Sequence, residues 1–151
     1  MNVFRYFTVY GPAGRPDMSL FRFVQWISEG RLVTVYGDGQ QSRDFTYVDD
    51  IARGTIAGLK PLGYEVINLG SDQPVVLMDA IRLWKNWQAK AQRWSTNPAI
   101  PPMCWRRGRT SARRSDSWAG SHKWGFQDGV RRLVIWYQQN REWVKDVDTG
   151  R

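Results

Sequence analysis

The stretch "VYGDGQQSRDFTYVDD", Val35 to Asp50, sets two strand-like runs on either side of a glycine turn. The run Leu32 to Tyr36 is short, apolar and β-branched, which predicts a strand. Gly37-Asp38-Gly39 closes that strand as a turn. Arg43 to Val48 predicts a second strand, and Asp49 or Asp50 can cap a helix that follows it.

Helical spacing appears on both sides of this stretch. The helix that begins at Ser19 ends at Gly30, a residue typical of the position after a helix. The helix after Asp50 is expected to bury Ala52, Ile56 and Leu59. The last helix begins near Phe126. The apolar positions of the first and last helices are Leu20, Phe23, Val24 and Ile27, and Val130, Leu133, Val134, Tyr137 and Val144.

Further strands are expected over Phe4–Tyr10 and Val66–Leu69, and a short helix over Met78–Leu83. Strands therefore alternate with helices along the chain. This alternation predicts an α/β fold.

Basic residues and tryptophans concentrate between Trp84 and Lys123. The chain of 151 residues carries 22 Lys and Arg against 14 Asp and Glu, a net charge of +8. The window holds nine Lys or Arg and a single acid, Asp116, so the remainder of the chain is neutral, with 13 of each sign. The window also holds five of the nine tryptophans. Its apolar residues follow neither helical nor strand spacing.

The composition bounds the classes of function. One cysteine and one histidine exclude an internal disulfide and a structural zinc site, so no metal is expected. No apolar run approaches the length of a membrane span, so we expect a cytoplasmic protein without a membrane partner. Arginines interleaved with tryptophan over residues 106–114 leave a basic nucleic-acid-binding module as one alternative, but we expect no nucleic-acid partner.

Two motifs carry more than packing information: "RYFTVYGPAGRPDM", Arg5 to Met18, and the stretch from Val35 to Asp50. Together they resemble the C-terminal half of the extended short-chain dehydrogenase/reductases, the NAD-dependent nucleotide-sugar epimerases and dehydratases. The UDP-glucuronate 4-epimerase branch is the most similar. The segments "NLGSDQPVVLMDAI" and "GVRRLVIWYQQNREW" fit the same family. The resemblance covers residues 3–83 and about 124–146.

The resemblance implies roles for particular residues. Arg43 stands where the family contacts phosphate; without the resemblance it reads as a surface ion pair. Arg15 stands where the carboxylate of a uronic acid is expected, and a free loop arginine is its alternative. Phe7 matches a residue beside the nicotinamide of NAD. The substrate-binding set that the resemblance implies is Thr8, Arg15, Ser19, Leu20, Thr34, Val35, Tyr36 and Arg43. The segment Thr34–Tyr36 reads equally as an ordinary buried strand.

The chain also departs from the family. The catalytic pair of the family is Tyr-x-x-x-Lys, and none of the six tyrosines has a lysine four residues on; Tyr137 has Arg141. No G-x-G-x-x-G is present, since "GDGQQS" lacks the third glycine. We therefore expect a Rossmann-type substrate-binding part without its NAD-binding half, with no catalytic residue and no NAD bound by the chain itself. Intact relatives are expected to be homodimers that use NAD.

The sequence between Trp84 and Lys123 does not match the family as written. Read one base out of phase, Asn97 to Cys104 permits P-R-H-P-A-D-V, which resembles a family segment. Neighbouring stretches permit three further family segments in the right order. We interpret residues 84–123 as translated out of phase between two compensating frameshifts, and expect them to be poorly ordered because they were never selected to pack. A second arginine and an aspartate that the family uses at the nucleotide would then be absent.

The chain accordingly divides into residues 1–83, a substrate-binding lobe with the last strand of the Rossmann sheet; residues 84–123; and residues 124–151, a helix of the same lobe. The implied function is binding of a UDP-sugar, UDP-glucuronate or UDP-galacturonate, by part of a 4-epimerase that is inactive alone. Part of a UDP-glucose 4-epimerase or of a nucleotide-sugar 4,6-dehydratase is the alternative within the family.

Overall fold

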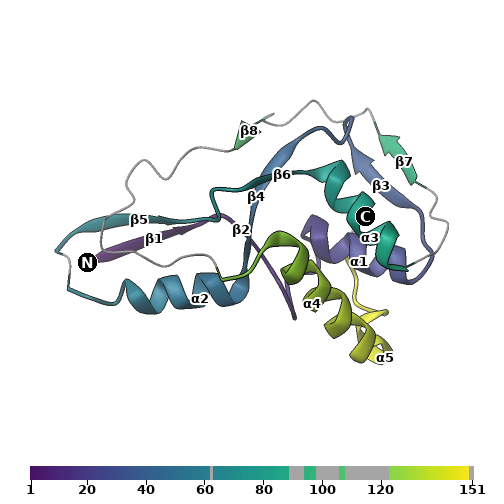
Figure 1. The fold of residues 1–151 in the computed structure, drawn as a ribbon. Coiled ribbons are helices and arrows are strands. Elements are labelled where there is room, and N and C mark those ends of the chain that lie inside the picture. Colours follow the sequence, from purple (N-terminus) through teal and green to yellow (C-terminus); the bar gives the residue numbers. More distant parts are fainter. Residues whose placement is uncertain (62, 89–93, 98–105, 108–122, 150–151) are drawn as a thin grey trace.

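The computed structural model describes residues 1–151 except 62, 89–93, 98–105, 108–122 and 150–151 (Figure 1). Strands and helices follow one another along the chain. The strands are β1 (Asn2–Tyr6), β2 (Thr8–Tyr10), β3 (Val33–Tyr36), β4 (Ser42–Tyr47), β5 (Glu65–Leu69), β6 (Pro74–Val76), β7 (Trp94–Asn97) and β8 (Arg106–Arg107). The helices are α1 (Ser19–Ser28), α2 (Val48–Ala57), α3 (Leu77–Gln88), α4 (Phe126–Gln139) and α5 (Arg141–Val144). The expected α/β class is confirmed.

Most strand pairs in the described part of the chain are parallel. β1 pairs with β5, β2 with β4, and β3 with β7, all in parallel. β4 also pairs with β8 in parallel and with β6 in antiparallel orientation. Parallel pairing requires crossovers, and α1 and α2 supply helices between the strands.

The single strand expected over Phe4–Tyr10 is divided at Phe7. β1 pairs with β5, whereas β2 pairs with β4, so the two halves of the run belong to different sheets. The backbone N–H of Phe7 donates to the carbonyl of Leu69, 3.0 Å away, at the end of the β1–β5 pair. Phe7 therefore stands at the carboxyl ends of two parallel strands.

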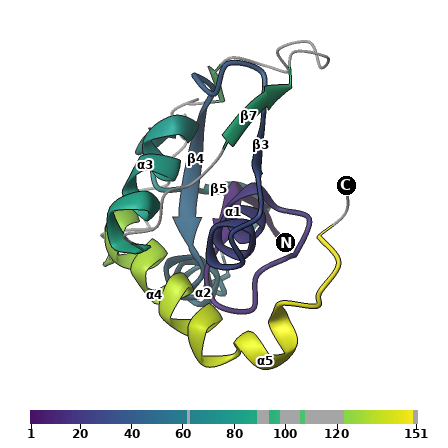
Figure 2. The ribbon, with the colours of Figure 1, turned by 90° about the vertical axis from the view of Figure 1, so that its right-hand side faces the viewer.

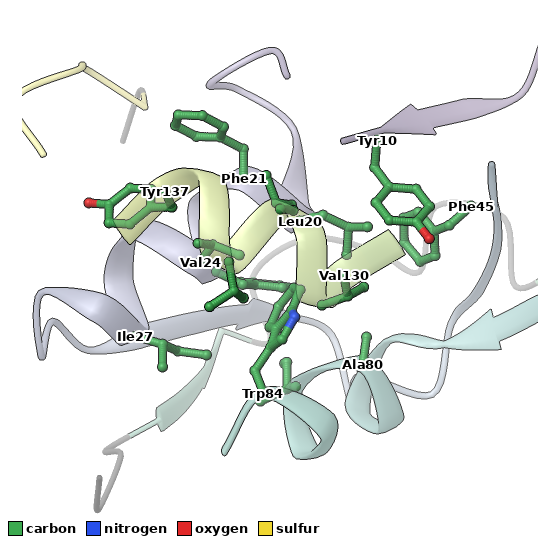
Figure 3. Close-up of a cluster of buried hydrophobic side chains, with 14 of the residues drawn as sticks. Tyr10, Leu20, Phe21, Val24, Ile27, Phe45, Ala80, Trp84, Val130 and Tyr137 are labelled. Carbon is green, nitrogen blue, oxygen red and sulfur yellow. The ribbon is translucent and has the colours of Figure 1, made fainter. Parts of the chain in front are cut away.

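One main core joins α1, α3 and α4 to β2, β3 and β4 (Figures 2 and 3). The apolar positions expected for the first and last helices are all buried in it. α1 ends as its sequence predicts: Gly30 has φ +67 and its N–H donates to the carbonyl of Ile27, 3.3 Å away. The hydrophobic periodicity of α1 and α4 thus predicted their buried faces correctly.

The face expected for α2 is wrong. Ala52, Ile56 and Leu59 are exposed, and α2 instead buries Asp50, Ile51 and Gly54. Ile51 packs against Ile67 and Leu69 in a smaller cluster beneath the β1–β5 pair. The apolar residues therefore occupy two faces of α2, and the described chain covers only one of them.

The expected cap of α2 also differs from the structure. The helix begins at Val48, so Asp49 and Asp50 lie within its first turn and Tyr47 occupies the N-cap position, without a side-chain capping hydrogen bond. Buried Asp50 instead accepts hydrogen bonds from the backbone N–H groups of Lys123 and Trp124, 3.2 and 3.3 Å away. It also pairs with Arg53. Its carboxylate thus fixes the segment that leads into α4.

The helix expected to end at Leu83 continues to Gln88. Trp84, placed in the out-of-phase segment by the sequence, is 1 % exposed and meets Phe23 edge-on with ring centroids 5.5 Å apart. Figure 3 shows its indole pointing from α3 into the core. We expected residues 84–123 to be poorly ordered, but Trp84 packs into the core because it continues the buried face of Ala80 and Ile81. The side chains of Trp87, Trp94, Trp105 and Trp118 lie outside the described residues.

Candidate functional site

A pocket opens between the end of β2, the loop that follows it, and the start of α1. It is a shallow depression with a cavity volume of about 10 Å³, and most of the space above it is open solvent. Four residues expected at the substrate line it: Thr8, Arg15, Ser19 and Leu20. Tyr10, Met18, Phe21 and Leu133 complete much of the apolar wall. Thr8 and Leu20 are 12 positions apart in the sequence, and the fold adds Leu133 from α4 to the same pocket.

The loop that carries Arg15 depends on Gly11. This glycine has φ +148, and a Cβ there would lie 2.6 Å from Cγ1 of Val48. Only glycine allows both the backbone conformation and the close approach to α2. The Gly-Pro sequence that ends β2 therefore fixes the direction in which the loop leaves the sheet and reaches the pocket.

Arg15 is an exposed cation at the mouth of the pocket. Its guanidinium forms a bidentate pair with Asp17: Nε donates to Oδ1 at 3.1 Å and an NH2 group donates to Oδ2 at 2.6 Å. The hydrogen bond from Arg15 lowers the pKa of Asp17 below its ordinary value. Arg15 therefore already shows the geometry with which it can hold a carboxylate.

The start of α1 forms another side of the pocket. Ser19 is the first residue of the helix, the preceding Met18 gives no side-chain cap, and the first turn contains no acid. The first N–H groups of a helix have no partner within it and favour negative charge. Leu20 lines the pocket but is buried in the main core, so its side chain has mainly a packing role.

Tyr10, which the sequence analysis did not assign to the site, forms part of the pocket wall. Its hydroxyl donates to the carbonyl of Phe126, 3.2 Å away. Burial raises the pKa of Tyr10 well above its ordinary value, so the phenol stays protonated at neutral pH. The alternation of its strand predicts burial, but the sequence gives no sign that it reaches the pocket.

Phe7 directly precedes Thr8 of the pocket in the sequence, but its ring packs against Gly70 instead of lining the pocket. A Cβ placed on Gly70 would overlap Cδ2 of Phe7 and lie 2.7 Å from its Cε2, so the ring lies directly on the glycine. Asp44, which is buried, holds the next turn: its carboxylate accepts from the N–H and hydroxyl of Ser71 at 2.8 and 2.5 Å, and from the N–H of Asp72 at 2.9 Å. Asp44 thereby keeps the end of β5 against Phe7.

The same region matches known proteins. A sequence profile described as the NAD dependent epimerase/dehydratase family matches residues 1–70. The chain is 44 % identical to the UDP-glucuronate 4-epimerase of Thermodesulfobacterium geofontis over 151 residues, which cover 97 % of this chain and 46 % of that protein. The chain belongs to the NAD-dependent epimerase/dehydratase family.

Two solved structures share this fold. The UDP-glucuronic acid 4-epimerase of Bacillus cereus, in complex with UDP-glucuronic acid and NAD, has a TM-score of 0.77 and 33 % identity, over 91 % of this chain and 45 % of that one. MoeE5 in complex with UDP-glucose and NAD has a TM-score of 0.78 and 27 % identity, over 93 % of this chain and 48 % of that one. The chain therefore spans about half the length of the relatives it matches.

The other residues expected at the nucleotide do not line the pocket. Val35 is fully buried, so only its backbone can face a ligand, while Tyr36 is partly exposed at the end of β3. The backbone of Thr34–Tyr36 pairs with β7 along one edge. Arg43 lies on β4 where this strand pairs with β6 and β8. Its NH1 group donates a hydrogen bond to the carbonyl of Ser42, 3.1 Å away. The assignment of Thr34, Val35, Tyr36 and Arg43 to UDP stays a prediction.

Three further expectations concern the basic segment, metal binding and membrane insertion. Of the basic segment 106–114, only Arg106 and Arg107 lie in the described part of the chain, as strand β8. Among the described residues, no group of His, Cys, Asp and Glu could hold a metal ion. No helix among those residues is long and apolar enough to cross a membrane.

Proposed function

We propose that this chain is the sugar-nucleotide-binding part of an NAD-dependent nucleotide-sugar 4-epimerase, and that it takes a UDP-uronic acid, UDP-glucuronate or UDP-galacturonate. The observation that carries the proposal is the pocket that places Arg15, Thr8 and Ser19 around one space. The relatives named UDP-glucuronate 4-epimerase support the choice of substrate.

The chemistry of the pocket suits the sugar end of such a ligand. The guanidinium of Arg15 matches a carboxylate in a bidentate pair, as its contact with Asp17 illustrates. The hydroxyls of Thr8 and Ser19 can donate to and accept from sugar hydroxyls. The uncapped start of α1 adds a positive partial charge on the same side. A uronic acid is therefore favoured over a neutral hexose.

The UDP end is proposed to reach Arg43 and the segment Thr34–Tyr36. Arg43 is only partly buried, and a planar guanidinium can bridge two phosphate oxygens. Tyr36 is exposed enough to offer its ring to a flat base. The side chain of Val35 takes no part, because it is buried in the core.

NAD supplies hydride transfer in this family, but few residues of this chain are candidates for binding NAD. Among the described residues, Phe7 is our one candidate for a contact with NAD, and its ring is already packed on Gly70. The sequence has neither a G-x-G-x-x-G loop nor a Tyr-x-x-x-Lys pair. We propose that the chain recognises and orients the sugar nucleotide and that it does not epimerise it alone.

Calorimetric titration of the purified chain tests the binding proposal. UDP-glucuronate is expected to bind at least several-fold more tightly than UDP-glucose, and Arg15→Ala is expected to remove that preference while leaving UDP-glucose binding unchanged. Arg82→Ala is the matched control, since Arg82 is an equally exposed arginine in an Asp–Arg pair on α3. Equal affinity for both sugars would favour part of a UDP-glucose 4-epimerase or a dehydratase instead, and no binding of either would reject the proposal.

The proposed lack of activity needs a separate measurement. The chain is incubated with UDP-glucuronate and NAD, and the 4-epimer is sought by chromatography. No UDP-galacturonate is expected, whereas the same assay with the intact Bacillus cereus enzyme should yield it. Turnover by the purified chain would show that a base outside the family's Tyr-x-x-x-Lys pair operates here.

A further inference from the structure

A second arginine lies behind the ion pair at the mouth of the pocket. Arg22 is the fourth residue of α1, and its backbone N–H donates to the carbonyl of Met18, 3.1 Å away. The residue is only partly exposed, and its Nε is buried without a hydrogen-bond partner in the described part of the chain. It follows Ser19 of the pocket by three positions, so the two side chains lie on one side of the helix. A partly buried cation therefore stands one helical turn behind the pocket.

The geometry of the helix start brings Arg22 toward Asp17. Met18 is the N-cap of α1, so Asp17 is the residue before the cap and Arg22 is the fourth helical residue. Side chains at these two positions commonly meet across the first turn, usually as an apolar pair. Here the two side chains carry opposite charges. The hydrogen bond from Arg15 has the largest effect in lowering the pKa of Asp17, and the charge of Arg22 lowers this pKa further. Asp17 therefore lies within electrostatic reach of two arginines.

The two arginines differ in their freedom to move. The side chain of Arg15 is 73 % exposed, and both carboxylate oxygens of Asp17 accept hydrogen bonds from it. Arg22 is partly buried, and a guanidinium that has lost part of its water is stabilised by an opposite charge nearby. Arg15 is thus able to turn toward a ligand, whereas Arg22 is placed to keep the carboxylate of Asp17 beside the helix start.

A uronic acid in the pocket would bring a second carboxylate to Arg15. Two carboxylates on one guanidinium repel each other, so binding is favoured if Asp17 has another cation to turn to. With Asp17 turned toward Arg22, positive and negative groups alternate from Arg22 through Asp17 and Arg15 to the ligand. Two arginines and one aspartate leave one net positive charge, which the carboxylate of a uronic acid neutralises and a neutral hexose does not. The arrangement therefore favours an acidic sugar.

We propose that Arg22 is a positioning residue that sets the preference of the pocket for a UDP-uronic acid, by taking over the carboxylate of Asp17 when Arg15 engages the ligand. This role rests on the proposed function, because it requires that the carboxylate of a uronic acid binds at Arg15. Arg22 itself lies behind the pocket wall rather than in it. Its effect reaches the ligand through Asp17 and Arg15.

Calorimetry with UDP-glucuronate and UDP-glucose tests the role of Arg22. Arg22→Gln is expected to weaken UDP-glucuronate binding by about three- to tenfold, because Asp17 then stays on Arg15. UDP-glucose binding should not change, which also shows that the variant is folded. Arg22→Lys should stay within about twofold of the unmodified chain, since it retains the charge that faces Asp17. An equal loss of both ligands in Arg22→Gln would mean a merely structural role for Arg22 and would overturn the proposal.

A double-mutant cycle with Asp17 separates this role from general attraction between Arg22 and the ligand. In an Asp17→Asn background, Arg22→Gln should change UDP-glucuronate binding by less than about twofold, because no carboxylate remains to move to Arg22. Arg31→Gln is the matched control, since it removes the same charge from an exposed position beyond the other end of α1 and should change neither affinity. A full effect of Arg22→Gln in the Asp17→Asn background would overturn the proposal.

The same titrations distinguish a failure of this proposal from a failure of the proposed function. If the unmodified chain binds neither nucleotide, the proposed function is rejected, and the role of Arg22 is rejected with it. If the unmodified chain binds both nucleotides equally, the preference for a uronic acid and the role of Arg22 are both wrong. If the unmodified chain prefers UDP-glucuronate and Arg22→Gln keeps that preference, the proposed function stands and the role of Arg22 alone is overturned.

Discussion

Arg15 and Asp17 form a bidentate ion pair at the mouth of the pocket, with donor–acceptor distances of 3.1 and 2.6 Å. The carboxylate that engages Arg15 is therefore supplied by the protein itself. A bound uronic acid has to displace or share this partner. Both side chains are more than half exposed, so water can solvate Asp17 when the pair opens.

Asp17→Asn is expected to strengthen binding of UDP-glucuronate by two- to fivefold and to leave UDP-glucose binding unchanged. The variant removes a negative charge that competes for Arg15 and repels the ligand's carboxylate. Calorimetry with the two nucleotides measures both effects. Asp79→Asn is the control, because Asp79 forms a similar exposed pair with Arg82 on α3. Weaker binding of UDP-glucuronate in Asp17→Asn would mean that Asp17 orients Arg15 rather than competes for it.

Gly70→Ala is expected to destabilise the fold by roughly 1–3 kcal/mol, because an added Cβ overlaps Phe7. The new methyl group would also lie 2.9 Å from a carboxylate oxygen of Asp44. Chemical denaturation measures the change. Gly125→Ala is the control, since a Cβ there has nothing nearer than Asp128, 3.8 Å away. Equal stability of the two variants would show that Phe7 moves aside at little cost.

A second ion pair links the end of α1 to α5. Arg141 donates from Nε and NH2 to the two carboxylate oxygens of Glu29, each at 2.9 Å, and the hydroxyl of Tyr137 donates to the same group at 3.0 Å. The hydrogen bond from Arg141 lowers the pKa of Glu29 below its ordinary value of 4.5. Burial and the bond to Glu29 raise the pKa of Tyr137.

Glu29→Gln is expected to lower the free energy of unfolding by roughly 1 kcal/mol at pH 7. The folded protein has the lower pKa, so the stabilisation by Glu29 is complete above about pH 4.5 and is lost as the pH falls through the folded-state value. The difference between the two proteins should therefore shrink below pH 4. Glu142→Gln, at an exposed glutamate of α5, should show no such change. A difference that persists at pH 3 would assign the effect to packing.

The sequence predicted the parts of the fold whose packing is local. α1 and α4 have one apolar stripe each, and periodicity alone located their buried residues. Arg15, Thr8 and Ser19 were assigned to one site by resemblance, and the fold brings them together. The division of the first strand at Phe7 was missed, because the run from Phe4 to Tyr10 has no glycine or proline to mark the change of sheet.

The errors at α2 and Trp84 have different causes. α2 carries apolar residues on two faces, and periodicity cannot say which face the present chain covers. Trp84 was assigned to a foreign segment by composition, yet it lies four residues after Ala80 and so continues the face of α3 that packs on α1. We predicted that Asp50 caps α2. Its contacts in the structure are with Lys123 and Trp124, which are distant in the sequence, so the local pattern could not reveal them.

The Trp84 side chain is buried in the core, but its indole N–H has no hydrogen-bond partner among the described residues. Trp84→Ala is expected to cost about 3–5 kcal/mol through the cavity it leaves. Trp84→Phe is expected to cost much less, because it fills most of the space and removes the unpaired donor. Urea denaturation compares them. Trp143→Ala, at an exposed tryptophan, is the control. A small effect of Trp84→Ala would show that α3 does not pack beyond Leu83.

The out-of-phase interpretation of residues 84–123 predicts a specific DNA sequence. The codons for Asn97 to Cys104 should give P-R-H-P-A-D-V when each triplet is formed from the last base of one codon and the first two bases of the next. The reading phase should be lost near codon 83 and regained near codon 123. Sequencing of codons 80–126 from the source DNA checks this. A chain in which the restored segment replaces residues 84–123 should bind UDP at least tenfold more tightly, because it regains an arginine and an aspartate at the nucleotide. A chain with a scrambled segment of the same composition should bind UDP no more tightly than the present chain. Codons that permit no family segment in any phase would mean that the tryptophans and arginines were selected as written.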